Sequence, residues 1–248
     1  MAMNEADVRN RWSSGSACHG LWSLLPGVVT ADVLARTGSD FVVVDLQHGA
    51  VSEAELPGIT AAIAAAGAVP LVRTRSPLFA DVGRPLDLGA CGVIVPNVRD
   101  AEHAREVVAA TRYAPAGVRS IGRLTGGAAQ PLVIAMVETA TALEDLDAVL
   151  AVEGLDGVYV GPGDLSLSLG LHGADRRAEL RSVLSSIIAR ATASGVPVGV
   201  HAYDGEEAAG YAAEGATIVT VAVDTVSLGE VMARHLEVGR SRAGADGR

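Results

Sequence analysis

The chain has 248 residues, of which 49% are hydrophobic and only 3% aromatic, and its formal net charge is -10. This charge argues against a nucleic-acid ligand, because phosphate binding needs clustered Lys and Arg. We find no run of about 18 apolar residues that could span a bilayer and no basic-then-apolar signal pattern at the N-terminus, so we expect a cytoplasmic protein without a membrane partner.

Short apolar segments alternate along the chain with Ala-rich segments of helical pattern, which indicates parallel strands joined by helical crossovers. The expected strands are 18–25, 41–45, 69–74, 92–96, 131–138, 157–161, 196–201 and 217–223. The expected helices lie near 28–37, 53–66, 78–88, 100–111, 141–151, 176–194, 205–214 and 226–239. Repeated units of this kind predict an α/β protein, a (β/α)8 TIM barrel.

The joints and the ends of the chain complete this prediction. Glycines that close a helix onto the next strand are expected in the left-handed conformation at Gly38, Gly67, Gly89, Gly195 and Gly215. No linker or shift in composition divides residues 1–248, so we expect one domain. Residues 1–14 and 240–248 are polar, and we expect them to be flexible.

Polar residues follow most of the predicted strands, at the end of a TIM barrel where catalytic groups gather. They are Asp45, Gln47, His48, Arg73, Glu138, Asp164, His201 and Asp224. Carboxylates that face each other across a barrel mouth repel unless a cation lies between them. Hard oxygen ligands without a Cys or HxxxH partner favour Mg²⁺ or Mn²⁺.

Several of these residues also have a structural interpretation. Asp164 and Asp224 could cap helices, and His201 could be a satisfied histidine of the barrel rim. Trp22, at the end of the first strand, could line the pocket or serve only in packing. Arg119 lies in a loop near the mouth, where it could meet the substrate or a second subunit.

Five phrases of the sequence together resemble one enzyme family. They are DFVVVDLQHG, PLVRTRSP, RPLDLGACGVIVPNVRDAEHAREVVAATRYAPAGVRS, MVETATALEDLDAVLAVEGLDGVYVGPGDLSLSLG and VTVAVDT. From about Gly20 to Leu236 the chain is similar to the metal-dependent (class II) pyruvate aldolases of the HpcH/HpaI family, such as the 4-hydroxy-2-oxoheptanedioate aldolases, and to a branch with a QHG motif.

The resemblance implies reversible cleavage of 4-hydroxy-2-oxo acids to pyruvate and an aldehyde, through a pyruvate enolate held by a divalent metal. Glu138 and Asp164 would ligate that metal, Mg²⁺ or Mn²⁺, with Co²⁺ or Zn²⁺ as alternatives. Arg73 would contact the keto oxygen of pyruvate. His48 and Asp45 would form a dyad that handles the hydroxyl proton through a water. The family also implies a homo-oligomer, a trimer or hexamer, whose C-terminal helix packs on or is swapped with a neighbouring subunit.

The residues themselves support this chemistry. Asp45 could fix the tautomer of His48 by accepting a hydrogen bond from its ring. The backbone around Gly161, Pro162 and Gly163 could bind the pyruvate carboxylate where the next helix begins, although a tight turn without a ligand explains these glycines equally well. The sequence contains no Lys, which excludes a Schiff-base aldolase.

The chain departs from better-known family members in three places. It has Gln47 where they carry Glu, and Met136 where many carry Gln. Gln47 could hold a water or a substrate oxygen but could not act as a base. The segment between RYAPAGVRS and PLVIAMVET has only about ten residues, which leaves the aldehyde specificity and the assembly open. Two alternatives remain: an oxaloacetate decarboxylase or macrophomate synthase-like enzyme that uses the same enolate, and a non-catalytic barrel with a binding or assembly role.

Overall fold

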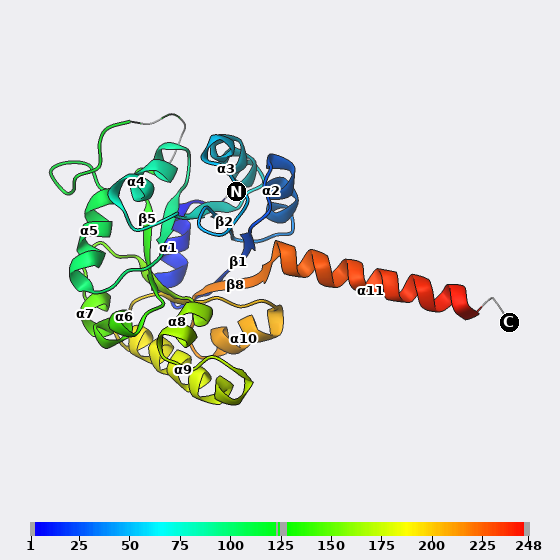
Figure 1. Cartoon of the computed structure of the whole chain (residues 1–248). Coiled ribbons are helices and arrows are strands. Elements are labelled where there is room, and N and C mark those ends of the chain that lie inside the picture. The colour runs from blue at the N-terminus through cyan, green and yellow to red at the C-terminus, as the bar shows by residue number, and fades with distance from the viewer. Residues whose placement is uncertain (1–2, 123, 125–127, 246–248) are drawn as a thin grey trace.

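The computed structural model describes residues 3–122, 124 and 128–245, with the side chains beyond Ser241 left out. Its centre is a closed barrel of parallel strands in chain order, so the predicted TIM barrel is confirmed (Figure 1). The strands are β1 Cys18–Ser23, β2 Phe41–Asp45, β3 Val69–Arg73, β4 Gly92–Val95, β5 Leu132–Val137, β6 Gly157–Val160, β7 Val198–Val200 and β8 Ile218–Val223. The short segment that follows Arg119 contains residues 123 and 125–127, which lie outside the described residues.

Helices follow the strands, and most of them surround the barrel (Figure 1). They are α2 Val28–Ala35, η1 Glu53–Glu55, α3 Leu56–Ala65, α4 Phe79–Asp87, α5 Ala101–Thr111, α6 Ala140–Glu144, α7 Leu146–Leu150, α8 Pro162–Ser168, η2 Ala174–Arg176, α9 Arg177–Ala193, α10 Gly205–Ala213 and α11 Asp224–Ala245. The helix expected at 141–151 is interrupted at Asp145, whose carboxylate accepts a hydrogen bond from the backbone N–H of Ala101 at 2.8 Å. All of the expected helix-closing glycines have positive φ.

Residues near the N-terminus form a helix, α1 Glu5–Ser13, where we expected a flexible segment. Asn4 and Asp7 form a capping box at its start. Val8 and Trp12 are four residues apart on one face of α1, and both are buried against the residues that fill the barrel interior. The helix therefore closes the amino-terminal end of the barrel, because two apolar side chains gain burial there.

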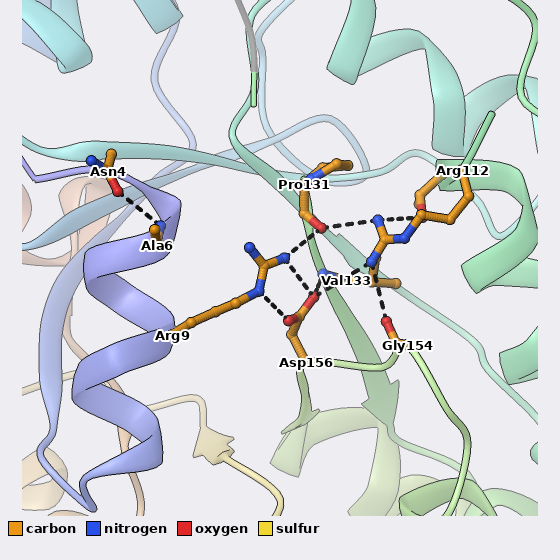
Figure 2. A network of polar contacts seen from close by, with 9 residues as sticks. Asn4, Ala6, Arg9, Arg112, Pro131, Val133, Gly154 and Asp156 are labelled. Atoms are coloured by element: carbon orange, nitrogen blue, oxygen red, sulfur yellow. Dashed lines mark hydrogen bonds and ion pairs between the residues drawn. The ribbon is translucent and has the colours of Figure 1, made fainter. Parts of the chain in front are cut away.

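An ion-pair network fastens α1 to the barrel (Figure 2). The Asp156 carboxylate accepts hydrogen bonds from Arg9 Nε at 2.6 Å and from the backbone N–H of Val133 at 2.8 Å. The carbonyl oxygen of Pro131 accepts from Arg9 at 3.0 Å and from Arg112 at 3.1 Å. The Asp156 carboxylate and the Pro131 carbonyl thus connect α1 with β5, with the loop before β6 and with the end of α5.

We expect Asp156→Asn to lower the free energy of unfolding by about 2 kcal/mol, because half-buried charged hydrogen bonds lose their acceptor charge. Asp147→Asn is the matched control, since Asp147 also pairs with an arginine but its side chain is 78% exposed. Its effect should stay within about 0.5 kcal/mol. Urea unfolding followed by circular dichroism measures both, and equal losses in the two variants would contradict a special role for the network.

Alternation along each strand separates two sets of core residues. In β2, Val42 and Val44 pack outward against the helices, whereas Phe41 and Val43 fill the barrel interior. The next inward position is Asp45, at the carboxyl end of the strand. The same alternation places side chains at the ends of other strands in the barrel mouth.

Helix α11 continues to Ala245, past the end predicted for the last helix, and extends away from the barrel (Figure 1). Residues 240–245, which we expected to be flexible, are helical, and residues 246–248 lie outside the described residues. Among the described helices, none combines the length and the apolar character needed to cross a bilayer.

Candidate active site

The carboxyl ends of the strands surround a pocket of about 230 Å³. Its lining comprises Trp22, Leu24, Asp45, His48, Arg73, Met136, Glu138, Gly161, Pro162, Gly163, Asp164, His201, Tyr203, Val223 and Val226. The structure therefore brings together the predicted site residues except Gln47, Asp224 and Arg119, which do not line this pocket. The Gln47 side-chain oxygen is buried and lacks a hydrogen-bond partner among the described residues.

A buried ion pair between β2 and β3 forms one wall of the pocket. Asp45 and Arg73 are paired residues of adjacent strands, and the carboxylate accepts from Nε of the guanidinium at 2.9 Å and from Nη2. Trp22 donates its indole N–H to the same carboxylate at 3.0 Å, and the guanidinium carbon lies 5.1 Å from the centre of the indole ring. Asp45 and Trp22 thus hold Arg73 in one orientation, with its Nη1 without a hydrogen-bond partner in the described part of the chain.

The predicted contact between Asp45 and the His48 ring is not formed among the described residues. Asp45 accepts instead from the backbone N–H groups of Gln47 at 2.9 Å and His48 at 3.2 Å. Burial by itself raises the pKa of Asp45, but the hydrogen bonds and charge of Arg73 outweigh it and hold this pKa below its usual value. The carboxylate therefore orders Arg73 and the turn that carries His48, a residue that also lines the pocket.

Glu138 and Asp164 also line the pocket. Glu138 follows β5 and is 2% exposed, and its Oε1 accepts a hydrogen bond from the backbone N–H of Asn97 at 2.6 Å. Burial raises the pKa of Glu138, and the nearby negative charge of Asp164 raises it further. A β-carbon on Gly161 would lie 2.9 Å from Glu138 Oε2, so the glycine leaves room for this carboxylate.

Two other candidates have structural roles. Asp224 is the first residue of α11, and its carboxylate accepts from the backbone N–H groups of Leu24 and Leu25 and from the Ser23 hydroxyl. It therefore connects the ends of β1 and β8. Arg119 donates to Asp87 at 2.5 Å and lies 4.8 Å over the Tyr113 ring, and it lines a different groove from the pocket described above.

Comparisons with known proteins agree with this geometry. Residues 19–230 match the family described as HpcH/HpaI aldolase/citrate lyase. The chain belongs to the HpcH/HpaI family. It is 37% identical over 235 residues to a hydroxypyruvate/pyruvate aldolase of Rhizorhabdus wittichii, a match that covers 89% of this chain and 93% of that protein.

Further relatives support the same class of enzyme. A 2-keto-3-deoxy-L-rhamnonate aldolase of Salmonella paratyphi B is 35% identical over 236 residues, which cover 90% of this chain and 88% of that protein. The crystal structure of an HpcH/HpaI family protein from Burkholderia cenocepacia superimposes with a TM-score of 0.87 at 28% identity, covering 94% of this chain and 98% of that one. The prediction that this protein is an aldolase, a type of lyase, is confirmed by its HpcH/HpaI family and its aldolase relatives.

The donor set of this HpcH/HpaI site fits a hard divalent cation. Glu138 Oε2 has no hydrogen-bond partner among the described residues, and its neighbour Asp164 adds a second carboxylate. Within the described part of the chain, no group of three or more His, Cys, Asp and Glu side chains could hold a metal. Two carboxylates that leave positions for water and substrate suit a hard divalent cation better than one that prefers a closed protein cage.

Sequence reasoning missed two residues that shape the site. Asn97 has φ of 55°, a left-handed conformation that turns its N–H toward Glu138, and Asn is among the few residues that adopt it readily. Tyr203 follows β7 and lines the pocket beside His201, with their ring centres 5.1 Å apart. The only sequence signal for either residue was its position shortly after a strand.

Proposed function

We propose that the protein catalyses the reversible aldol cleavage of 4-hydroxy-2-oxo acids to pyruvate, or a related 2-oxo acid, and an aldehyde. Glu138 and Asp164 would hold a divalent metal, Mg²⁺ or Mn²⁺, that supplies Lewis-acid stabilisation of the enolate when it is bound. The observation that carries this proposal is that a buried, ordered guanidinium and two carboxylates line one small pocket.

Arg73 provides fixed positive charge for the negative charge that develops during cleavage. When the bond between C3 and C4 breaks, its electron pair moves into the C2–C3 bond and negative charge gathers on the keto oxygen. Nη1 of Arg73 has no partner in the described part of the protein and can donate to that oxygen. Because Asp45 and Trp22 already orient the guanidinium, little reorganisation is needed as the charge develops.

His48 is the best-placed base for the substrate hydroxyl, which must lose its proton as the bond breaks. The backbone of His48 is fixed by Asp45, and the residue lines the pocket. Backbone N–H groups in the first turn of α8, at Gly163 and Asp164, are available for the substrate carboxylate because a helix leaves its first N–H groups without internal partners. Pro162 can contribute only shape to this site.

The test is a screen of aldehydes with pyruvate, with Mg²⁺ or Mn²⁺ and with EDTA, followed by mass detection of adducts. We expect adducts that depend on the metal and disappear in EDTA. An oxaloacetate arm without aldehyde separates the alternative reaction, since the same enolate could form by decarboxylation. Release of carbon dioxide with no adduct from any aldehyde would replace the aldolase proposal with a decarboxylase, and inactivity in every arm would favour a binding role.

We also propose that the protein works in the cytoplasm as a homo-oligomer, a trimer or hexamer in which α11 packs on a neighbouring copy. Leu228, Met232 and Leu236 are spaced by four residues on α11, and each is about half exposed. An apolar groove of about 560 Å³ lies beside the start of α11, where α2 exposes Val29 and Val33. Light scattering after size exclusion should show an oligomer that Met232→Glu weakens, and a monomeric parent protein would contradict this assembly.

A further inference from the structure

His201 lies in the pocket, but the proposed mechanism gives it no task. It follows Val200 at the end of β7, at an inward position of the strand, and its ring lines the pocket. The ring meets Trp22 edge-on, with ring centres 4.8 Å apart at 87°, and Tyr203 in the same way, 5.1 Å apart at 86°. Two aromatic contacts at nearly right angles restrict the rotation of the imidazole.

Two buried hydroxyl groups stand behind His201. Nδ1 lies 3.3 Å from the Tyr159 hydroxyl, which in turn lies 2.6 Å from the Thr220 hydroxyl. Both Tyr159 and Thr220 are fully buried. Buried hydroxyl groups that are hydrogen-bonded in a chain hold the group at its end in place, so Nδ1 is engaged from the barrel interior.

The imidazole is neutral at physiological pH. Burial lowers the pKa of His201 to about 4, and the positive charge of Arg73 contributes to this shift while Asp45 opposes it. A neutral imidazole has one donor nitrogen and one acceptor nitrogen. Since Nδ1 is engaged with Tyr159, Nε2 is the ring nitrogen that remains to hydrogen-bond a ligand.

Nε2 is the ring nitrogen of this pocket-lining residue that Tyr159 does not engage. It has no hydrogen-bond partner among the described residues, and it is not one of the fully buried atoms that lack a partner. The hydroxyl chain can run in either direction, which makes Nε2 a donor in one tautomer and an acceptor in the other. A hydroxyl group on a ligand matches both tautomers, because it donates and accepts. A carbonyl or carboxylate oxygen matches only one.

The pocket lining also includes the apolar residues Leu24, Met136, Val223 and Val226. A substrate hydroxyl placed against these residues would lose its hydrogen bonds to water. His201 offers a replacement bond there, whereas Glu138, Asp164 and Arg73 supply the charged groups that the 2-oxo acid needs.

We propose that His201 is a specificity-determining residue, which hydrogen-bonds a hydroxyl group on the substrate and so favours hydroxylated substrates over their deoxy analogues. This inference rests on the aldolase function proposed above. The hydroxyl could belong to C3 of the 2-oxo acid or to the carbon next to the aldehyde group, and the experiment distinguishes the two sources.

The experiment compares His201→Phe with the parent protein in the presence of Mg²⁺ or Mn²⁺. Phenylalanine keeps the ring contacts to Trp22 and Tyr203 and removes both nitrogens. One arm compares hydroxypyruvate with pyruvate at a fixed aldehyde, and the other compares glycolaldehyde with acetaldehyde at fixed pyruvate. The ratio of kcat/KM for the hydroxylated over the plain substrate should fall by about tenfold in one arm, the value of one hydrogen bond, and that arm identifies the source.

Further variants keep the test decisive. His201→Gln places an amide near the position of Nε2 and should restore part of the ratio. Tyr159→Phe removes only the hydroxyl that contacts Nδ1 and should lower the same ratio by about threefold. This variant also tests the inference if His201→Phe fails to fold. Ratios that stay at the parent value in both arms, or that collapse only in Tyr203→Phe, would overturn the inference while leaving the aldolase function intact. Absence of aldol activity in the parent protein would instead refute the proposed function.

Discussion

Glu138→Gln is expected to lower kcat/KM for aldol cleavage by about 10³-fold, because Lewis-acid stabilisation of an enolate contributes several kcal/mol and each 1.36 kcal/mol is about tenfold in rate. Gln keeps an acceptor for the backbone N–H of Asn97, so the local fold should persist. What it removes is one of the two carboxylate charges that face the pocket. Asp164→Asn should behave in the same way.

Glu144→Gln is the matched control, since Glu144 is an exposed acid on α6, the helix that follows Glu138 in the chain. This substitution should change kcat/KM by less than about twofold. Titration calorimetry with Mn²⁺ should show weaker metal binding in Glu138→Gln and parent-like binding in Glu144→Gln. Because burial and Asp164 raise the pKa of Glu138, metal-free Glu138→Gln should also unfold at a higher temperature than the metal-free parent at neutral pH. Parent-like turnover and metal affinity in both Glu138→Gln and Asp164→Asn would refute the assignment of the metal ligands.

Strand alternation explains why much of the site could be predicted from the sequence. In FVVVD the apolar residues fix the register, and Asp45 must then continue the inward set of Phe41 and Val43. The same reasoning places Arg73 after Val69 and Leu71. Because parallel strands of a closed barrel end at the same face, inward polar residues from separate strands converge without any knowledge of the loops.

The remaining features of the site depend on loop geometry, which the sequence pattern does not predict. The three-residue spacing of Asp45 and His48 suggested a contact between their side chains, but in a tight turn that spacing brings the backbone N–H to the carboxylate. The role of Asn97 depends on one positive φ angle after β4, which no periodic pattern encodes. Helix α1 was missed because the segment is polar on average, although Val8 and Trp12 share one buried face.

Asp45→Asn is expected to lower the free energy of unfolding by about 3–5 kcal/mol, because it leaves the Arg73 guanidinium buried without a counter-charge. Turnover should fall as well, by about 10²-fold, since the guanidinium is no longer held toward the keto oxygen. The sign of the pH effect follows from the lowered pKa of Asp45. In the parent protein, this stabilisation is present above the unfolded-state pKa of about 3.9 and is lost as pH falls through the folded-state pKa.

The double variant Asp45→Asn/Arg73→Met separates stability from catalysis. Replacing a buried ion pair with uncharged groups of similar volume is often nearly neutral, so the double variant should regain most of the stability that Asp45→Asn loses. Turnover should not recover, because the pocket that holds Glu138 and Asp164 then lacks the Arg73 guanidinium. Chemical unfolding and kcat/KM, measured on the parent, both single variants and the double variant, provide the complete cycle. Recovery of turnover together with stability would mean that Arg73 serves the fold alone, and the enolate would then need another source of positive charge.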